Sequence, residues 1–157
     1  MAYFEYPNCY YFAKTIAMLT NAAGPFLLVE DDEDDEKLFV EILQSFNIPN
    51  SIMCFRNGKD LLTYLRASEE VPFMILCDIN MPVMDGFMLR NKMNEDRALR
   101  GRSTPFIFFS THAGTATVQK AYQLCIQGFF QKGNSVTELT QALRTIVDYW
   151  SVSQRPQ

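Results

Sequence analysis

Short apolar runs alternate with longer amphipathic stretches along most of the chain. Five runs are too short for a helix and end in polar or turn residues, as the buried strands of a parallel sheet do. They cover residues 26–29, 52–55, 73–77, 105–109 and 129–131. Each run is followed by a stretch whose apolar residues recur three or four positions apart, which is the spacing of one helix face. Five strand-then-helix units in series predict an α/β fold with a doubly wound, five-stranded parallel sheet and five helices.

Local signals place the ends of several predicted helices. Residues 34–36 put three carboxylates into the first turn of the first helix, where they suit the positive end of the helix dipole. Most of this acidic run is expected to be solvated, with Asp32 able to act on a nearby site through water. Ser135, followed three residues later by Glu138, predicts a capping box at the start of the last helix. The polar segment 94–103 predicts a loop.

The regular pattern begins near Pro25 and ends near Trp150. We therefore expect one domain over residues 25–150, an N-terminal appendage over residues 1–24 and a short tail over residues 151–157. The chain has 157 residues, 48% of them hydrophobic, which suffices for a single core. The appendage is either a short helix with an apolar face or a poorly ordered tail. Translation could also begin naturally at Met18.

Charge narrows the classes of function. The net charge of −4 and the pI near 5.0 give no attraction to nucleic acid or to an anionic membrane, so we expect neither as a direct partner. Seven acidic residues run from Glu30 to Glu36; because the whole chain carries −4 and this run −7, the remaining chain carries +3. The acidity is local, and it requires a local reason.

Cysteine usage and hydropathy indicate the compartment. The cysteines are widely spaced without a Cys-x-x-Cys pair, and three lie in apolar segments, so we expect buried free thiols in a reducing compartment. They are Cys9, Cys54, Cys77 and Cys125. No apolar stretch approaches the roughly 20 residues that span a bilayer, and the N-terminal segment lacks the features of a signal peptide. We expect a cytoplasmic protein.

Asp78 follows the third predicted strand directly. In open α/β sheets, ligands gather beyond the carboxyl ends of the strands, so an aspartate at this position is placed for chemistry. The alternative is that Asp78 only caps a turn, because aspartate is common where loops begin. Its own strand does not separate the two interpretations.

The other strand ends favour the chemical interpretation. Glu30 and Asp31 follow the first strand, Ser110 the fourth and Lys132 the fifth. Converging carboxylates repel one another unless a cation lies among them, and hard oxygen ligands suit Mg²⁺. Mg²⁺ also takes phosphate oxygens, and a lysine adds a point charge for the same oxygens. The set predicts phosphoryl transfer, with an aspartate able to serve as nucleophile.

At these residues the chain resembles the receiver domains of two-component response regulators. Residues 78–86 read Asp-Ile-Asn-Met-Pro-Val-Met-Asp-Gly and match the family's phosphoacceptor signature Asp-x-x-Met-Pro-x-Met-Asp-Gly. Glu30-Asp31, Ser110 and Lys132 stand where the family has its acidic pair, its hydroxyl residue and its lysine. The resemblance covers Pro25 to about Trp150. It implies the flavodoxin-like strand order 2-1-3-4-5, which is known for the chemotaxis response regulator.

The resemblance also implies the chemistry. A single-domain response regulator would accept a phosphoryl group on Asp78 from a histidine kinase or a phosphotransfer protein in a phosphorelay. It would be a signalling protein rather than an enzyme, with intrinsic self-phosphorylation and autodephosphorylation. Ser110 and Lys132 would hold the phosphoryl oxygens. The implied ligands of Mg²⁺, or of Mn²⁺, are Glu30, Asp31, Asp78 and the backbone carbonyl of Asn80.

A conformational switch and an output surface follow from the same resemblance. Phosphorylation would draw the Ser110 hydroxyl inward, and Phe129 would rotate into the vacated space. The changed surface would comprise the helix at 118–125, the strand at 129–131 and the helix at 139–150. We expect a downstream effector protein to bind there, and a homodimer stays open.

Two residues are implied to tune the lifetime of the phosphoryl group, and two depart from the family pattern. Asn80 and His112 occupy the tuning positions, although His112 could equally be an exposed polar loop residue. Gly133 stands where the family usually has proline, which predicts a looser loop. Phe129 replaces the commoner tyrosine and lacks its hydroxyl.

Two other classes of protein share part of this pattern. A hydrolase of the haloacid dehalogenase type also uses an aspartate nucleophile with Mg²⁺, but it requires a second aspartate two residues on as a general acid. Asn80 occupies that position and cannot transfer a proton. A pseudo-receiver would act by binding alone, and the complete set of active-site residues argues against it.

Overall fold

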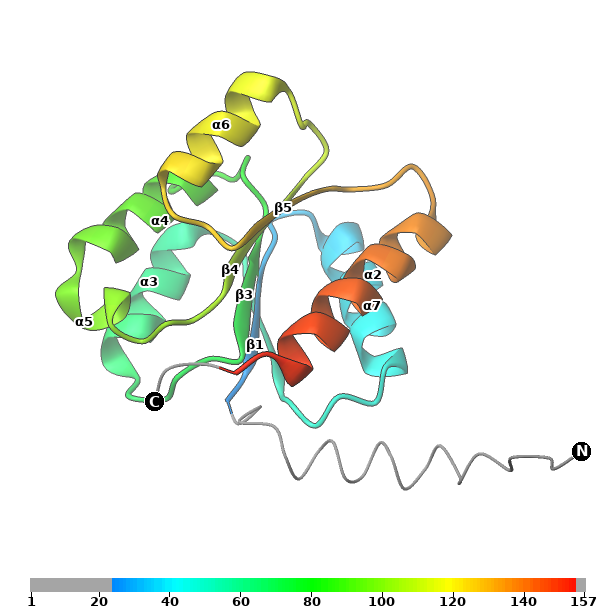
Figure 1. Cartoon of the computed structure of the whole chain (residues 1–157), viewed down its shortest axis with the longest axis horizontal. Coiled ribbons are helices and arrows are strands. Elements are labelled where there is room, and N and C mark those ends of the chain that lie inside the picture. The colour runs from blue at the N-terminus through cyan, green and yellow to red at the C-terminus, as the bar shows by residue number, and fades with distance from the viewer. Residues whose placement is uncertain (1–23, 155–157) are drawn as a thin grey trace, which may run out of the picture.

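The computed structural model describes residues 24–154, and these form a three-layer α/β fold (Figure 1). The sheet has five strands, all parallel, in the order β2-β1-β3-β4-β5, which confirms the predicted order. The strands are β1 (Phe26–Val29), β2 (Ile52–Phe55), β3 (Met74–Cys77), β4 (Phe106–Ser110) and β5 (Gly128–Gln131). The helices are α2 (Glu33–Ser45), α3 (Gly58–Ala67), α4 (Gly86–Glu95), α5 (Arg97–Arg100), α6 (Thr115–Gln123) and α7 (Val136–Val152). The expected N-terminal helix or tail lies outside the described residues, apart from Gly24.

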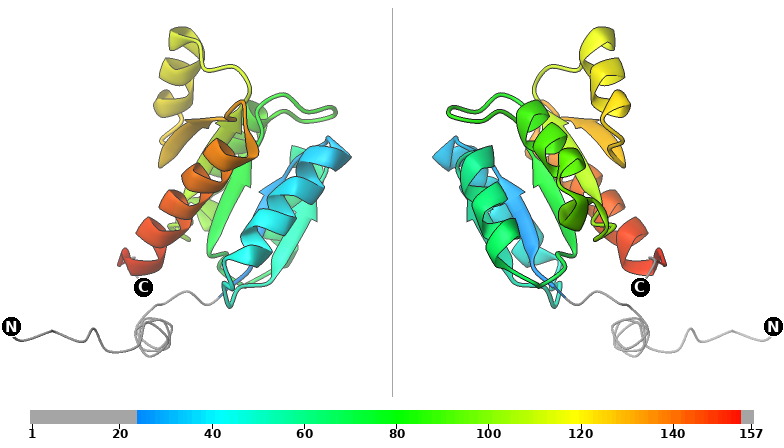
Figure 2. Two further views of the ribbon diagram at one scale, coloured as in Figure 1. Left: turned by 90° about the vertical axis from the view of Figure 1, so that its right-hand side faces the viewer. Right: turned by 90° about the vertical axis from the view of Figure 1, so that its left-hand side faces the viewer.

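Helices cover both faces of the sheet. Figures 1 and 2 show α2 and α7 on one face and α3, α4, α5 and α6 on the other. Successive side chains of a strand point to opposite faces. Accordingly Leu28 and Phe109 pack in the core beneath α2 and α7, whereas Val29 and Phe108 pack in the core beneath the other helices. The central strands β1, β3 and β4 are buried throughout, so they read as continuous apolar runs in the sequence.

The described residues contain one helix more than the sequence predicts. α5 is a single turn inside the expected polar loop at 94–103. The Asp96 side chain caps it by accepting from the backbone N–H groups of Ala98 and Leu99, and Leu99 is buried. One turn is too short to produce a periodic pattern. The last helix also runs past Trp150, to Val152.

The expectation of buried thiols is right for Cys77 and wrong for two other cysteines. Cys54 and Cys125 are exposed. Cys54 lies on β2, an edge strand with one neighbour, and Cys125 lies in the connection between α6 and β5, where it takes a left-handed φ of 55°. A position within an apolar segment therefore did not ensure burial. Among the described residues, no helix is long and apolar enough to cross a membrane.

The turn after β3 closes tightly onto the sheet because residue 86 is glycine. The backbone N–H of Gly86 donates to the Ile79 carbonyl at 2.9 Å, and Asp85 caps α4 by accepting from the N–H of Met88 at 2.7 Å. A Cβ atom at Gly86 would lie 2.5 Å from the Asp78 carbonyl oxygen and 2.7 Å from the Phe108 ring. The Asp-Gly pair of the signature thus holds the start of α4 against the segment that carries Asp78.

Alanine at position 86 is expected to destabilise the fold, because backbone and a core ring cannot both move away from the new methyl group. We expect Gly86→Ala to lower the free energy of unfolding by about 2 kcal/mol in urea denaturation. Gly101→Ala is the control, since its Cβ would be 3.6 Å from the nearest atom; we expect a change below about 0.5 kcal/mol there. Equal stability of the two variants would contradict this account of the turn.

Candidate functional site

The predicted site residues meet at one edge of the sheet. β1, β3, β4 and β5 are consecutive neighbours, and Glu30, Asp31, Asp78, Ser110 and Lys132 end or directly follow them. Backbone hydrogen bonds continue the sheet into this edge: the Asp78 N–H donates to the carbonyl of the last residue of β1 at 2.9 Å, and the Lys132 N–H donates to the Ser110 carbonyl at 2.8 Å. The rigid part of the fold therefore sets the backbone positions of these residues.

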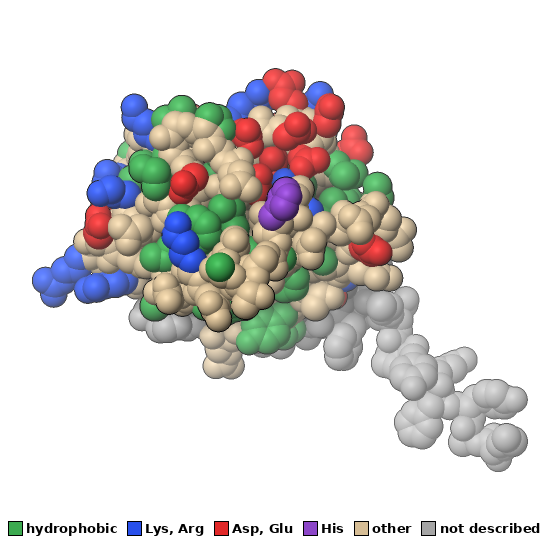
Figure 3. Space-filling model, turned by 90° about the horizontal axis from the view of Figure 1, so that it is seen from above, with side chains coloured by type: hydrophobic (Ala, Val, Ile, Leu, Met, Phe, Trp, Pro, Cys, Tyr) green, Lys and Arg blue, Asp and Glu red, His purple; other side chains and the backbone are tan. Residues whose placement is uncertain are grey.

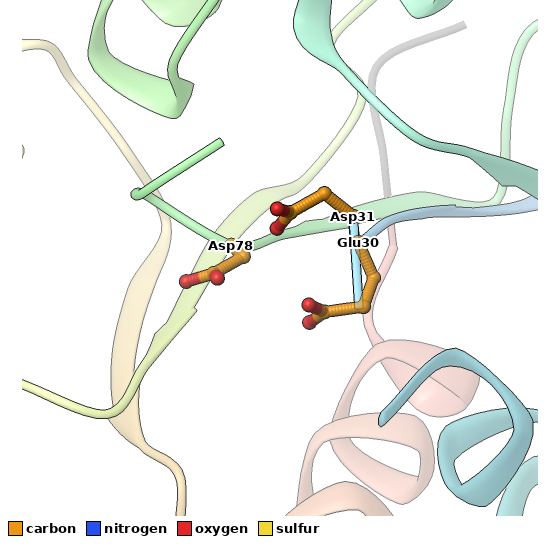
Figure 4. A group of neighbouring side chains, drawn as sticks. All are labelled: Glu30, Asp31 and Asp78. Carbon is orange, nitrogen blue, oxygen red and sulfur yellow. The ribbon is translucent and has the colours of Figure 1, made fainter. Parts of the chain in front are cut away.

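Three carboxylates are grouped closely enough to hold one metal ion. One carboxylate oxygen from each of Glu30, Asp31 and Asp78 lies within 4.8 Å of the others. Figure 4 shows the three side chains next to one another, with Glu30 and Asp31 directed toward Asp78, and Figure 3 shows acidic side chains gathered on this surface of the molecule. Hard oxygen donors from a few carboxylates, with room for water and phosphate oxygens, are what Mg²⁺ and similar ions prefer. The donor set fits a divalent cation.

Lys132 is buried among carboxylates. Its side chain is 9% exposed, and its Nζ lies 2.6 Å from Glu30 Oε2, 2.8 Å from Asp35 Oδ2 and 3.7 Å from Asp78 Oδ2. Asp35 is an addition to the predicted site, because the sequence interpretation left it in the solvated part of the acidic run. Asp32 caps α2 by accepting from the N–H of Asp35 at 2.9 Å, which fixes the turn that carries Asp35.

The charges of the site are only partly balanced. Burial raises the pKa of the Glu30 carboxyl to about 7, even though Lys132 donates to it. Burial also raises the pKa of Asp78, and the charge of Lys132 and the N–H of Ile79 counteract this only in part. Burial alone would lower the pKa of Lys132, but hydrogen bonds to Asp35 and Glu30 raise it above its ordinary value. One ammonium does not neutralise these carboxylates, which is the situation in which a bound cation is favourable.

Ser110 and His112 lie two residues apart in the chain and differ in exposure. Ser110 is 1% exposed, and its hydroxyl oxygen accepts from the backbone N–H of His112 at 3.3 Å. The His112 ring is exposed and lies 2.9 Å from the Thr111 hydroxyl. It does not belong to the group of three carboxylates. His112 is thus an exposed residue of a loop. A role in tuning the lifetime of the phosphoryl group stays a prediction.

Phe129 lies on the same side of the sheet as Ser110. It is half-buried, pairs with Phe108 in the sheet register, and its ring centroid is 6.4 Å from that of Phe108. Ser110 is two residues beyond Phe108 and so points to the same side. Asn80, two residues after Asp78, is exposed.

Gly133 leaves room for the start of α7. A Cβ atom at Gly133 would lie 2.6 Å from the Glu138 Cβ. The Glu138 carboxylate accepts from the N–H of Asn134 at 2.9 Å, and the Glu138 N–H donates to the Ser135 hydroxyl at 3.2 Å. The predicted cap is present, but the carboxylate reaches Asn134 rather than Ser135. The looser loop expected from Gly133 stays a prediction.

Comparison with known families now decides the class of protein. The model of the response regulator receiver domain matches residues 26–144. The chain belongs to this family. Receiver domains belong to two-component signalling and are signalling modules rather than conventional enzymes, so the hydrolase alternative is excluded. The predicted family and fold class are both confirmed.

Individual relatives agree with this receiver assignment. The probable methanogenesis regulatory protein FilR2 of Methanothrix harundinacea is 28% identical over 135 residues, which cover 82% of this chain and 86% of FilR2. The phosphorylated cyanobacterial phytochrome response regulator RcpA, known from a crystal structure, has 26% sequence identity to this chain. The two folds superpose with a TM-score of 0.77 over 85% of this chain and 99% of RcpA. The Mn²⁺-bound form of response regulator Rcp1, a protein of Synechocystis, shares the fold with a TM-score of 0.76 at 23% identity over 85% of this chain and 99% of that structure.

Proposed function

We propose that this receiver domain acts as a single-domain response regulator that accepts a phosphoryl group on Asp78. The observation that carries the proposal is the convergence of three carboxylates within 4.8 Å of one another beside a buried lysine, whose Nζ is 3.7 Å from Asp78 Oδ2. The phosphoryl donor would be a histidine kinase or a phosphotransfer protein. The phosphorylated state of the relative RcpA supports this chemistry in a similar chain.

The chain's own residues would perform the transfer as follows. An oxygen of Asp78 forms a bond to phosphorus while the bond from phosphorus to the donor's imidazole nitrogen breaks, and the imidazole keeps the electron pair and takes up a proton. Lys132 and the Ser110 hydroxyl donate to the phosphoryl oxygens. A divalent cation, when bound, would neutralise charge on those oxygens. Attack of water on the acyl phosphate later restores Asp78 and releases phosphate.

The residues that would hold the cation are Glu30, Asp31 and Asp78, with the backbone carbonyl of Asn80 as a further ligand. The burial of Glu30 and the short distances among the carboxylates support this assignment. The Mn²⁺-bound form of Rcp1 supports a divalent ion in general. We propose Mg²⁺ as the physiological ion, with Mn²⁺ able to replace it.

We propose the surface formed by α6, β5 and α7 as the output surface for an effector protein or a second copy of the chain. Figure 2 shows these elements together at one end of the sheet. α6 buries a single residue, Ala121, and no side chain caps its start, which leaves it free to shift when Phe129 rotates. Tyr122 on α6 and Tyr149 on α7 are exposed aromatic side chains of the kind that protein interfaces use.

A phosphoryl analogue tests the proposal. Beryllofluoride with Mg²⁺ is expected to shift the amide resonances of the wild-type chain around Asp78, Ser110 and Lys132 beyond the changes that Mg²⁺ alone causes next to its carboxylate ligands. Beryllofluoride without Mg²⁺ is expected to cause no shift. A pseudo-receiver would show no such joint effect. Absence of a joint effect would overturn the proposed function while leaving the family assignment intact.

A further inference from the structure

The ammonium group of Lys132 is held by a residue outside the family's set of active-site positions. Asp35, in the first turn of α2, accepts a hydrogen bond from Lys132 Nζ at 2.8 Å. Glu30 accepts a second hydrogen bond from the same Nζ at 2.6 Å. Asp78 Oδ2 is 3.7 Å away, beyond hydrogen-bond distance. In the unphosphorylated protein, the lysine therefore hydrogen-bonds to two carboxylates other than the proposed phosphoacceptor.

A phosphoryl group on Asp78 would compete with Asp35 in two ways. The Lys132 ammonium must approach the phosphoryl oxygens, and this weakens or breaks its hydrogen bond to Asp35. The carboxylate of Asp35 also adds a negative charge close to a group that itself carries negative charge, and like charges repel. Both effects act in the same direction, against phosphorylation.

We propose that Asp35 restrains Lys132 and so lowers the affinity of the site for a phosphoryl group. This inference rests on the proposed function of Asp78. Asp35 is a positioning residue, because it acts through Lys132 and is not one of the three carboxylates that could hold the metal. Movement of Lys132 toward the phosphoryl group releases Asp35, so the first turn of α2 is coupled to the phosphorylation state.

The chain offers a closely matched control for this idea. Asp34 precedes Asp35 in the same helical turn, carries the same charge and is capped by the same Asp32 side chain, but its own side chain is 97% exposed and is 3.9 Å from Lys37. Asp34→Asn removes the same charge without touching Lys132. Any difference between the Asp34→Asn and Asp35→Asn variants reports the contact with Lys132.

The test is the dissociation constant of beryllofluoride at saturating Mg²⁺, followed by NMR titration. Because the Asp35 side chain is 41% exposed and solvent screens it, we expect Asp35→Asn to bind about three- to tenfold more tightly than wild type. Asp35→Ala is the second variant, since an asparagine oxygen can still accept from Lys132. Asp34→Asn is expected to bind like wild type.

A double-mutant cycle separates the contact from general electrostatics. In a Lys132→Gln background, the gain in affinity from Asp35→Asn is expected to shrink to the smaller part that direct charge repulsion contributes. If both Asp35 variants bind like Asp34→Asn, or if the full gain persists without Lys132, the restraint is overturned while the proposed function stands. If the wild-type chain does not bind beryllofluoride at all, the proposed function fails and this inference with it.

Discussion

Replacing Asp78 by asparagine is expected to abolish phosphorylation completely. When the wild-type chain is incubated with acetyl phosphate and Mg²⁺, intact-protein mass spectrometry should detect one phosphoryl group per chain. The Asp78→Asn variant should remain at the level of untreated protein, because an amide oxygen is a poor nucleophile and forms no stable acyl phosphate.

The same variant should unfold at a higher temperature than wild type without metal, since it removes a buried charge that lies close to two other carboxylates.

Asp85→Asn is the control for this experiment. Asp85 belongs to the same signature but caps α4 from a half-buried position, and asparagine caps helices as well as aspartate does. We expect the control to be phosphorylated. Labelling of Asp78→Asn at the wild-type level would show that another residue accepts the phosphoryl group.

Replacing Lys132 by methionine is expected to cause the largest loss of stability. Methionine keeps the apolar stem but leaves Glu30, whose side chain is 3% exposed, without its ammonium partner. Breaking a buried ion pair from one side leaves an uncompensated charge, and we expect Lys132→Met to lower the free energy of unfolding by about 3 kcal/mol in metal-free urea denaturation. Adding Glu30→Gln to this variant should recover part of the loss, since it removes that charge.

Lys37→Met provides the comparison for an exposed pair. Lys37 is 68% exposed and lies 3.9 Å from Asp34, so its loss should change the free energy of unfolding by less than about 0.5 kcal/mol. If Lys132→Met is no more destabilising than Lys37→Met, the buried charges of the site do not depend on Lys132.

The carboxylates and the lysine of the site could be predicted from the sequence because a parallel sheet restricts where residues at strand ends can lie. A parallel sheet places the carboxyl ends of neighbouring strands at one edge, so an acidic residue directly after an apolar run must lie there. The four charged residues of the site each lie within one or two residues of a strand end, namely Glu30, Asp31, Asp78 and Lys132. Their roles in phosphoryl transfer come from the family resemblance and stay proposals.

Asp35 could not be assigned in the same way. It lies on a helix, and the direction in which a first-turn side chain points depends on how α2 packs on the sheet, which no local pattern encodes. The signal in the sequence was only the acidic run from Glu30 to Glu36, in which every member looks alike. Only Glu30 and Asp35 of this run accept hydrogen bonds from Lys132, which lies 97 positions after Asp35 in the chain.

The other differences have similar causes. Cys54 is exposed because β2 is an edge strand, and edge position depends on the strand order rather than on the run itself. α5 escaped prediction because a single turn capped by Asp96 leaves no periodicity. In each case the missing information was tertiary.

The most direct test of the account identifies the residue that carries the phosphoryl group. Borohydride reduces an aspartyl phosphate to homoserine, and peptide mass spectrometry locates the homoserine. After treatment with acetyl phosphate and Mg²⁺, the account predicts homoserine at position 78 alone, and none when Mg²⁺ is removed by chelation. Homoserine at another position, or none at position 78 in a chain that has gained a phosphoryl group, would contradict it.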